Sequence, residues 1–451
     1  MVFTLGIRNI GPFSSAEIEI RPLTVIIGKN SVGKSFQMNL IWSLLNAQHG
    51  LDFFDALIER GALSLGEEIF RIVNRTDTDA ENLKNTFNQL LRTAVKCYSK
   101  SMASGLMSFL EKTYSVEVGK LVKFGADNSE IRVKGSEGEV KITIADGALE
   151  FDGLEELLSK YLENIETNMI KGAIGLRPKF SETTNYFRIS FIGDVFTAAA
   201  DLLWTAYRQA LFKLPKNEYV ALLVDSRVGI TRFFSTPYAE FPRKVGLPEV
   251  EFRRIYFKLA EAVHQKRVKQ ELIEPFLKEL DVEVVSRPEG GYFTLYVKSG
   301  FGVSLPLREA PSGVKESLTV ALALALQEPM VVMIEEPEAH LHPRAQRALV
   351  RLMARAVNEL GKTIIISTHS DYILSSINNL IALSGKPEIQ KELGYDVKEA
   401  LNPETVAAYL LRREQDSTVV ERLTVEREGI PEDEFAEVSH EILVERSEAL
   451  P

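Results

Sequence analysis

The sequence predicts an α/β fold built on a parallel sheet, and two patterns point to it. Leu23 to Ile27 is a continuous apolar run, typical of a strand buried on both faces, and a glycine-rich turn and a helical pattern follow it. From Ser312 onward, helical patterns alternate with apolar strands, as they do in α/β domains. The strands expected there are Met330 to Ile334, Thr363 to Ser367 and Asn379 to Leu383.

The rest of the chain divides around this pattern. We expect a split head domain, 1–50 and 216–385, and a mainly helical insertion, 51–215, with a β-hairpin at about 130–152. One long charged helix is expected over 248–280, within the head. The last segment, 386–451, predicts a small α+β tail made of a hairpin and an acidic helix.

Composition and charge limit the classes of protein that fit. Hydrophobic residues make up 45% of the 451 and charged residues 26%, which suits a soluble globular chain. Segment 386–451 has 17 acidic and 8 basic side chains, so it carries −9 of the net −10. The nearly neutral remainder argues against broad non-specific binding of nucleic acid, although a local basic face could coexist with the tail.

The same composition gives expectations about compartment. The single cysteine, Cys97, allows neither an internal disulfide nor a cysteine metal cluster, which suits a reducing compartment. The first residues lack a signal peptide's pattern, and the apolar stretch from Leu318 to Ile334 is interrupted. We therefore expect a cytoplasmic protein with no membrane partner.

The turn after Ile27 carries the clearest chemical signal. It matches G-x-x-x-x-G-K-[ST] in full, with a buried strand before it and a helix after it, the context that distinguishes a phosphate-binding loop from a chance match. Backbone N–H groups there would hold phosphate oxygens, Lys34 would reach the β- and γ-phosphates, and Ser35 would bind Mg²⁺. The predicted nucleotide-binding residues are Gly28, Lys29, Asn30, Ser31, Val32, Gly33, Lys34, Ser35 and Phe36.

Two carboxylates end the strand over 330–334. A nucleotide hydrolase needs one acid near the metal and a second to polarise the attacking water. Glu335 suits the metal role and Glu336 the catalytic role, provided that the backbone turns at the strand end so that both face the site. Taken alone, Glu335 to Glu338 could equally be a solvated acidic loop.

Two further signals are weak by themselves. His369 follows the strand over 363–367 and could contact the γ-phosphate, although a lone histidine is usually a surface or satisfied core residue. Ser312-Gly313-Val314-Lys315-Glu316 opens a helix, and taken alone it is better explained as an ordinary helix cap.

The order of these motifs resembles the ABC-type P-loop ATPases, specifically their SMC/RecF/OLD-like branch. The matching text comprises Ile7 to Phe13, the loop at Gly28, the Ser312 helix, Ile334 to Pro343 and Ser367 to Ser370. The tract from Asp225 to Ile230 also looks like a motif that recurs in this group. The resemblance is strong over about 1–48 and 305–383 and loose between them.

This resemblance implies a homodimer in which two heads clamp two ATP molecules. Ser312, Gly313 and Lys315 of one copy would act in trans, on the ATP held by Lys34 of the other, and the turn over 339–342 would cross the interface. Glu336, Lys34 and His369 would be catalytic, and Ser35 and Glu335 would hold Mg²⁺. The sequence departs from the family with Glu335 in place of aspartate, with Ser-Gly-Val-Lys-Glu in place of Ser-Gly-Gly-Gln, and without an assignable glutamine after the loop.

We expect an ATPase, and two hypotheses for its role remain open. The first is an association with DNA in repair or in defence against mobile elements, supported by a basic stretch that could also be the solvated face of a helix. That stretch is Arg243, Lys244, Arg253, Arg254, Lys258, Lys266, Arg267 and Lys269. The second is an ATP-gated switch that controls a separate effector protein without binding nucleic acid.

The sequence also bears on nuclease and transport activity. OLD-like enzymes often carry a Toprim nuclease with an Asp-x-Asp pair, and no such pair follows Ser370. Asp77-Thr78-Asp79 has the spacing but no buried strand before it. We therefore expect no nuclease activity from this chain, and a role as a transporter subunit is disfavoured.

Overall fold

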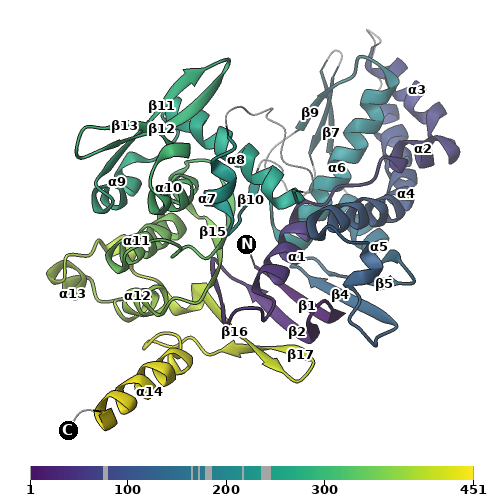
Figure 1. Ribbon diagram of the computed structural model, residues 1–451. Coiled ribbons are helices and arrows are strands. Elements are labelled where there is room, and N and C mark those ends of the chain that lie inside the picture. Colours follow the sequence, from purple (N-terminus) through teal and green to yellow (C-terminus); the bar gives the residue numbers. More distant parts are fainter. Residues whose placement is uncertain are drawn as a thin grey trace. The chain divides into compact units, whose positions relative to one another are not determined.

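The computed structural model describes residues 2–74, 80–163, 166–170, 173–177, 185–215, 218–234 and 245–449 (Figure 1). Contacts within the chain divide it into two compact units, 1–19 with 43–216, and 20–42 with 217–451. The division passes through helix α1 (Lys34–Asn46), between Trp42 and Ser43. The three-part division expected from the sequence stays a prediction.

The second unit contains a sheet whose strands are mainly parallel. Its order is β10-β14-β15-β3-β16-β17, with β16 and β17 antiparallel and the other neighbours parallel. The strands are β3 (Leu23–Gly28), β10 (Tyr219–Leu223), β14 (Met330–Glu335), β15 (Thr363–Thr368), β16 (Val406–Glu414) and β17 (Ser417–Leu423). Every side chain of β3, β14 and β15 is buried, as their continuous apolar runs predict.

Helices follow these strands, so the predicted α/β fold is confirmed. They are α7 (Arg227–Thr231), α8 (Leu247–His264), α9 (Gln270–Glu279), α10 (Ser312–Ala325), α11 (Pro343–Leu360), α12 (Asp371–Ala382), α13 (Pro387–Glu392) and α14 (Asp433–Ala449). Short 3-10 helices occur at 307–309, 397–399 and 403–405. Separately, β11 (Val282–Glu289), β12 (Tyr292–Ser299) and β13 (Ser304–Pro306) form an antiparallel sheet.

The strand expected over 379–383 is wrong. These residues belong to α12, which begins where the Ser370 Oγ accepts a hydrogen bond from the Ile373 N–H at 3.3 Å. Ile377, Leu380 and Ile381 are buried at helical spacing, so the apolar run belongs to a helix. The place beside β3 that another strand could take belongs to β16, from the predicted C-terminal hairpin.

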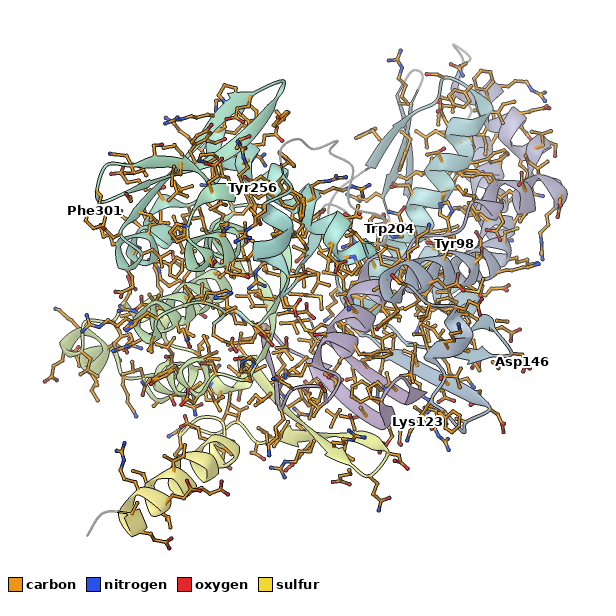
Figure 2. All side chains as sticks on the ribbon, in the orientation of Figure 1. Tyr98, Lys123, Asp146, Trp204, Tyr256 and Phe301 are labelled. Carbon is orange, nitrogen blue, oxygen red and sulfur yellow. The ribbon has the colours of Figure 1, made fainter. Side chains whose placement is uncertain are left out.

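The long helix expected over 248–280 is also wrong, because it is interrupted between α8 and α9. Lys266 has a positive φ of 57° there, and the Lys269 N–H donates to the Ala325 carbonyl at 2.8 Å. Val268 and Leu326 form an isolated β-bridge. Backbone bonding to a distant segment therefore overrides helical continuity. Tyr256 of α8, which is labelled in Figure 2, is fully buried in the core. Its ring packs with that of Phe234.

The first unit combines strands with a long helix. Its strands β2-β1-β4-β5-β6 are neighbours in sheet order, and β7-β8-β9 form a separate sheet. They are β1 (Phe3–Ile10), β2 (Phe13–Ile20), β4 (Asn128–Lys134), β5 (Glu139–Ala145), β6 (Ala148–Asp152), β7 (Glu166–Ile170), β8 (Ala173–Arg177) and β9 (Asn185–Arg188). Its helices are α2 (Asp52–Glu59), α3 (Ala62–Val73), α4 (Ala80–Tyr114), a 3-10 turn (Val118–Leu121), α5 (Leu154–Leu162) and α6 (Ile192–Phe212).

Within the described part of the chain, no helix is long and apolar enough to cross a membrane.

Candidate functional site

The turn between β3 and α1 has the geometry of a phosphate-binding loop. Ser31 and Gly33 have positive φ angles of 64° and 98°, which turn backbone N–H groups into the loop. The Lys34 Nζ donates to the carbonyls of Gly28 and Lys29, at 2.7 and 2.9 Å. Burial lowers the pKa of Lys34, and the charges of Glu336 and Glu338 oppose that fall. The lysine therefore lies inside the loop that it was predicted to serve.

The C-terminal hairpin supports this loop from one side. A Cβ on Gly28 would lie 2.6 Å from the Leu411 carbonyl of β16, so only glycine fits there. The Thr418 Oγ1 on β17 donates to the Val32 carbonyl at 2.9 Å. The hairpin predicted as part of an acidic tail thus packs against the phosphate loop and supports it.

Strand register brings the predicted site residues to one edge of the sheet. Glu335 on β14 pairs with Ser367 on β15, Thr368 pairs with Ile27 on β3, and Gly28 pairs with Leu411 on β16. The carboxyl ends of these parallel strands therefore meet, which is where ligands bind in open α/β sheets.

Glu335 is a buried carboxylate beside the loop. Its side chain is nearly inaccessible, and Oε2 accepts a hydrogen bond from the Asp225 N–H at 3.1 Å. Burial raises the pKa of Glu335 to about 6, and the Asp225 carboxylate adds to the rise, while the adjacent Ser35 side chain opposes it. The other oxygen, Oε1, is buried without a hydrogen-bond partner.

These groups fit Mg²⁺. An orphaned carboxylate oxygen beside a serine hydroxyl supplies two oxygen donors of the kind that Mg²⁺ prefers. Among the described residues, no group of three or more His, Cys, Asp or Glu side chains could hold a metal unaided. Phosphate oxygens and water usually complete the shell of a Mg²⁺ ion that is bound with a nucleotide.

Glu336 lies where the backbone turns after β14. Its φ is 45°, a left-handed conformation that is costly for a residue with a side chain and that occurs at functional sites. The Glu336 N–H donates to the Ser367 carbonyl at 2.9 Å, which fixes the turn to β15. Its carboxylate is one-third exposed, and Oε1 lies 3.4 Å from the Nδ1 of His369. The two adjacent carboxylates thus differ, one buried beside Ser35 and one accessible beside His369.

Glu338 is a site residue that sequence reasoning missed. Its Oε1 accepts hydrogen bonds from the Thr368 Oγ1 at 2.8 Å and from the His369 N–H at 3.0 Å. The same oxygen lies 3.7 Å from the Nδ1 of His369, whose side chain is about half exposed. This buried carboxylate therefore fixes the backbone that presents His369. Its only signal in the sequence is its place in the acidic run over 335–338, which by itself could equally be a solvated loop.

Arg227 is the second functional residue that the sequence alone does not identify, although it lies in the tract from Asp225 to Ile230 that looks like a family motif. It is fully buried, and its Nη1 donates to the carbonyls of Leu223 and Glu335 at 2.9 and 2.7 Å. Its Nη2 donates to the Glu336 carbonyl at 3.1 Å. A buried arginine in the Asp-Ser-Arg tract thus holds the backbone of both Glu335 and Glu336.

The three residues predicted to act in trans, Ser312, Gly313 and Lys315, differ from one another in their surroundings. Ser312 is the first residue of α10, and Pro311, not Ser312, occupies the N-cap. A Cβ on Gly313 would lie 2.7 Å from the His340 carbonyl, so the helix start packs closely on the turn after β14. Lys315 is buried, and its Nζ donates to the Arg308 carbonyl at 3.5 Å. Ser312 and Gly313 are half-buried, whereas the Lys315 ammonium is directed to its own chain.

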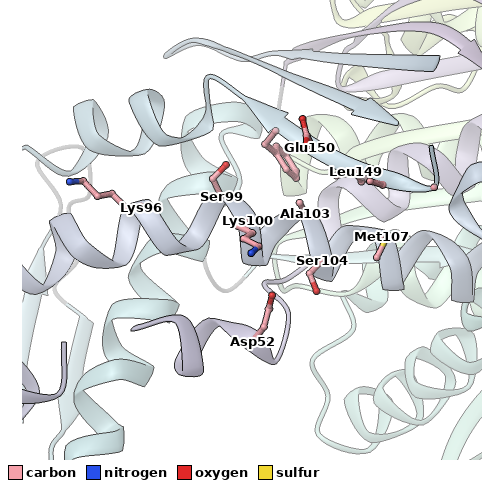
Figure 3. Close-up of a pocket in the computed structure, with 12 residues that line it drawn as sticks. Asp52, Lys96, Ser99, Lys100, Ala103, Ser104, Met107, Leu149 and Glu150 are labelled. Atoms are coloured by element: carbon pink, nitrogen blue, oxygen red, sulfur yellow. The ribbon is translucent and has the colours of Figure 1, made fainter. Parts of the chain in front are cut away.

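A cavity elsewhere does not share this chemistry. A hollow of about 550 Å³ lies in the first unit, between α4 and β6, with Lys96, Lys100 and Glu150 in its lining (Figure 3). None of the predicted nucleotide-site residues lines it. The strand-end edge, and not this hollow, is therefore the candidate nucleotide site.

Comparisons with known proteins bear on the family of the chain. The family model described as "AAA domain, putative AbiEii toxin, Type IV TA system" matches residues 125–375. The energy-coupling factor transporter ATP-binding protein EcfA1 of Caldanaerobacter subterraneus subsp. tengcongensis is 24% identical over 252 residues, covering 52% of this chain and 73% of that protein. The methionine import ATP-binding protein MetN of Francisella tularensis subsp. holarctica is 32% identical over 97 residues. That match covers 22% of this chain and 27% of MetN, so the chain spans about a quarter of that relative.

Two solved structures are also similar. The SMC head bound to the C-winged helix domain of ScpA has a TM-score of 0.45 and 11% identity, covering 94% of this chain and 98% of that one. The SMC head domain from Thermotoga maritima has a TM-score of 0.38 and 10% identity, with the same coverage. The family model spans more than half of the chain and includes β14, β15 and α10. The chain therefore belongs to this AAA domain family.

Proposed function

We propose that the chain hydrolyses ATP with Mg²⁺, and that it does so as a dimer with ATP held between two copies. The observation that carries the proposal is the convergence of Lys34, Ser35, Glu335, Glu336 and His369 at one sheet edge within one unit. The unpartnered Oε1 of Glu335 supports a metal beside the loop.

The residues would divide the work by their surroundings. The loop N–H groups and Lys34 would bind the phosphates, and Ser35 and Glu335 would hold Mg²⁺, whose charge would offset that of the phosphate oxygens. Glu336 accepts a proton from the attacking water, because its carboxylate is accessible and not paired with an arginine or lysine in the described contacts. His369 lies beside Glu336, where it would contact the γ-phosphate.

The position of helix α10, which begins with Ser312, supports the dimer. Gly313 packs on the His340 carbonyl, so the start of α10 and the turn over 339–342 form one continuous surface. His340 and Ser312 are at least partly accessible on it. A helix start with exposed N–H groups favours an anion, and a partner's γ-phosphate meets that requirement. We assign the trans contact to Ser312 and Gly313, because Lys315 is buried in its own chain.

A mixing experiment tests this arrangement. Lys34→Ala removes the phosphate contact, and Ser312→Arg places a bulky cation at the start of α10; we expect each variant alone to be inactive. Mixed together, the two variants should recover part of the ATP turnover, because a mixed dimer keeps one site with an intact Lys34 and an intact Ser312. Release of phosphate at several mixing ratios measures the recovery.

The control for mixing is a pair of variants that cannot complement each other. Lys34→Ala mixed with Glu336→Gln puts both changes on the same half of the site, so every mixed dimer has one defect in each site. Recovery in this control, or no recovery from Lys34→Ala with Ser312→Arg, would contradict a site shared between copies.

An association with DNA is a second proposal, and the ion pairs in the structure reduce the number of basic side chains that could contact DNA. Lys258 and Arg267 are paired with Glu328, and Lys269 with Glu359, so part of the basic stretch is neutralised internally. Arg243 and Lys244 lie outside the described residues. Arg253 and Arg254 line a hollow of about 480 Å³ with Phe257, Tyr292 and Phe293. Arginine beside aromatic rings suits phosphates and stacked bases.

The DNA proposal is tested by charge reversal at the hollow. Arg253→Glu with Arg254→Glu should weaken binding of a single-stranded oligonucleotide at least tenfold, because base stacking and two phosphate contacts are lost. Fluorescence anisotropy at several salt concentrations, with and without ATP, measures the effect. Lys278→Glu, on the exposed Lys278–Glu274 pair, is the matched control. If the unaltered protein binds neither single-stranded nor duplex DNA in a salt-dependent manner, the DNA proposal is wrong. The ATP-gated switch that controls a separate effector protein then replaces it.

A further inference from the structure

A buried ion pair connects two parts of the ATPase that serve different roles. The Arg227 Nε lies 2.8 Å from the Glu316 Oε2, and both side chains are almost completely inaccessible. The Glu316 Oε1 accepts a hydrogen bond from the Val228 N–H at 3.3 Å. Glu316 belongs to α10, in the turn of helix that begins with Ser312.

On its other side, Arg227 contacts the backbone at the end of strand β14, where the proposed catalytic residue lies. Its guanidinium donates to the carbonyls of Val224, Glu335 and Glu336, at 2.7, 2.7 and 3.1 Å. The planar guanidinium has five donors in a fixed fork, so a shift of one partner displaces the others. Because Glu336 is held at a φ of 45°, its carboxylate position depends on how its carbonyl is anchored.

A second contact joins the same two parts. Gly313 leaves no room for a side chain against the His340 carbonyl, and the Ala339 N–H donates to the Glu336 carbonyl at 3.1 Å. The start of α10 is therefore fixed to the catalytic turn twice, through Arg227–Glu316 and through the 339–340 turn. Movement of α10 must move or strain the backbone of Glu336.

We propose that the Arg227–Glu316 pair couples the two ATP sites of the dimer. The inference rests on the proposed shared site, in which α10 contacts the ATP of the partner while Glu336 acts on the ATP of its own chain. In that arrangement the pair joins two groups of one copy that belong to different ATP molecules. ATP engaged by α10 at one site then aligns Glu336 at the other, so hydrolysis is cooperative. Arg227 and Glu316 are positioning residues, since they touch neither nucleotide.

The test is the dependence of turnover on ATP concentration. The unaltered protein should give a Hill coefficient well above 1, with 2 as the limit for two sites. Arg227→Lys keeps the charge but cannot engage the carboxylate and the carbonyls together, so the coefficient should fall to about 1. The maximal rate should fall about tenfold, while the ATP concentration at half-maximal rate changes little. Glu316→Gln should give the same loss of cooperativity.

Two controls separate coupling from folding. Arg351→Lys changes a similar arginine, which contacts the Glu399 carboxylate at 2.8 Å and the Gly394 carbonyl at 3.0 Å, and should keep the Hill coefficient of the unaltered protein. Arg227→Met with Glu316→Met removes both buried charges, so it should retain the melting temperature better than either single methionine variant. It should still be non-cooperative.

The outcomes distinguish this inference from the proposed function. A protein that complements in the mixing experiment but has a Hill coefficient of 1, or keeps its cooperativity in Arg227→Lys and Glu316→Gln, overturns the coupling and leaves the shared site intact. In the mixed dimer the intact site lacks an ATP-engaged neighbour, so under the coupling its turnover should fall about tenfold, as in Arg227→Lys. No recovery at all overturns the shared site itself, and the coupling with it.

Discussion

Replacing Glu336 by glutamine is expected to lower the maximal rate of ATP hydrolysis a hundredfold or more while ATP stays bound. Positioned general bases contribute about 10²–10⁴-fold to a reaction, and glutamine cannot accept the proton of the attacking water. The change is nearly isosteric, and the hydrogen bonds that fix this turn use the backbone of Glu336. The fold and the loop should therefore be unaffected.

The same variant should persist as an ATP-bound dimer. ATP that is bound but not hydrolysed keeps the two copies together, so size-exclusion chromatography with Mg²⁺ and ATP should show the larger species. Single-turnover measurements should place the loss in the chemical step and not in binding. Turnover within threefold of the unaltered protein would show that another group is the base.

The adjacent residue is the matched control. Glu335→Gln changes a carboxylate that is buried beside Ser35 and has an unpartnered oxygen. Its main effect should be a higher Mg²⁺ concentration for half-maximal activity, because the metal loses an anionic oxygen donor. Titration of Mg²⁺ at saturating ATP should therefore separate the two glutamates. An identical Mg²⁺ dependence in both variants would contradict the division of roles.

The parts of the site that the sequence predicts are those set by short segments. The loop after β3, the carboxylates after β14 and the histidine after β15 each follow a buried apolar strand, and the parallel register brings them to one edge. Local pattern is sufficient there because the strand, its end and the functional side chain lie within about ten residues of one another.

The missed features depend on contacts between distant segments. Arg227 contacts the carbonyl of Glu335 across 108 positions, and β16 pairs with β3 across more than 380. Neither an arginine after a strand nor an apolar hairpin near the end of the chain specifies its partner, so no periodicity could assign them.

Lys34 shows most directly how the fold and nucleotide binding are connected. An ammonium group has three donors, and two of them are directed to the Gly28 and Lys29 carbonyls. The third remains for a phosphate oxygen. Burial lowers the pKa of Lys34, and the Glu336 and Glu338 carboxylates lie near enough to oppose that fall, so without this cation they would repel the phosphates.

Lys34→Ala should therefore weaken ATP binding at least a hundredfold, which is about 2.8 kcal/mol. A slowly hydrolysed ATP analogue at 100 times its dissociation constant should stabilise the unaltered protein by about 2.7 kcal/mol and the variant by less than about 0.5 kcal/mol. Thermal unfolding with and without the analogue measures both. Lys29→Ala is the matched control, because it removes an exposed side chain and keeps the backbone groups of the loop. If the two variants lose equal affinity, general loop charge and not the buried ammonium controls nucleotide binding.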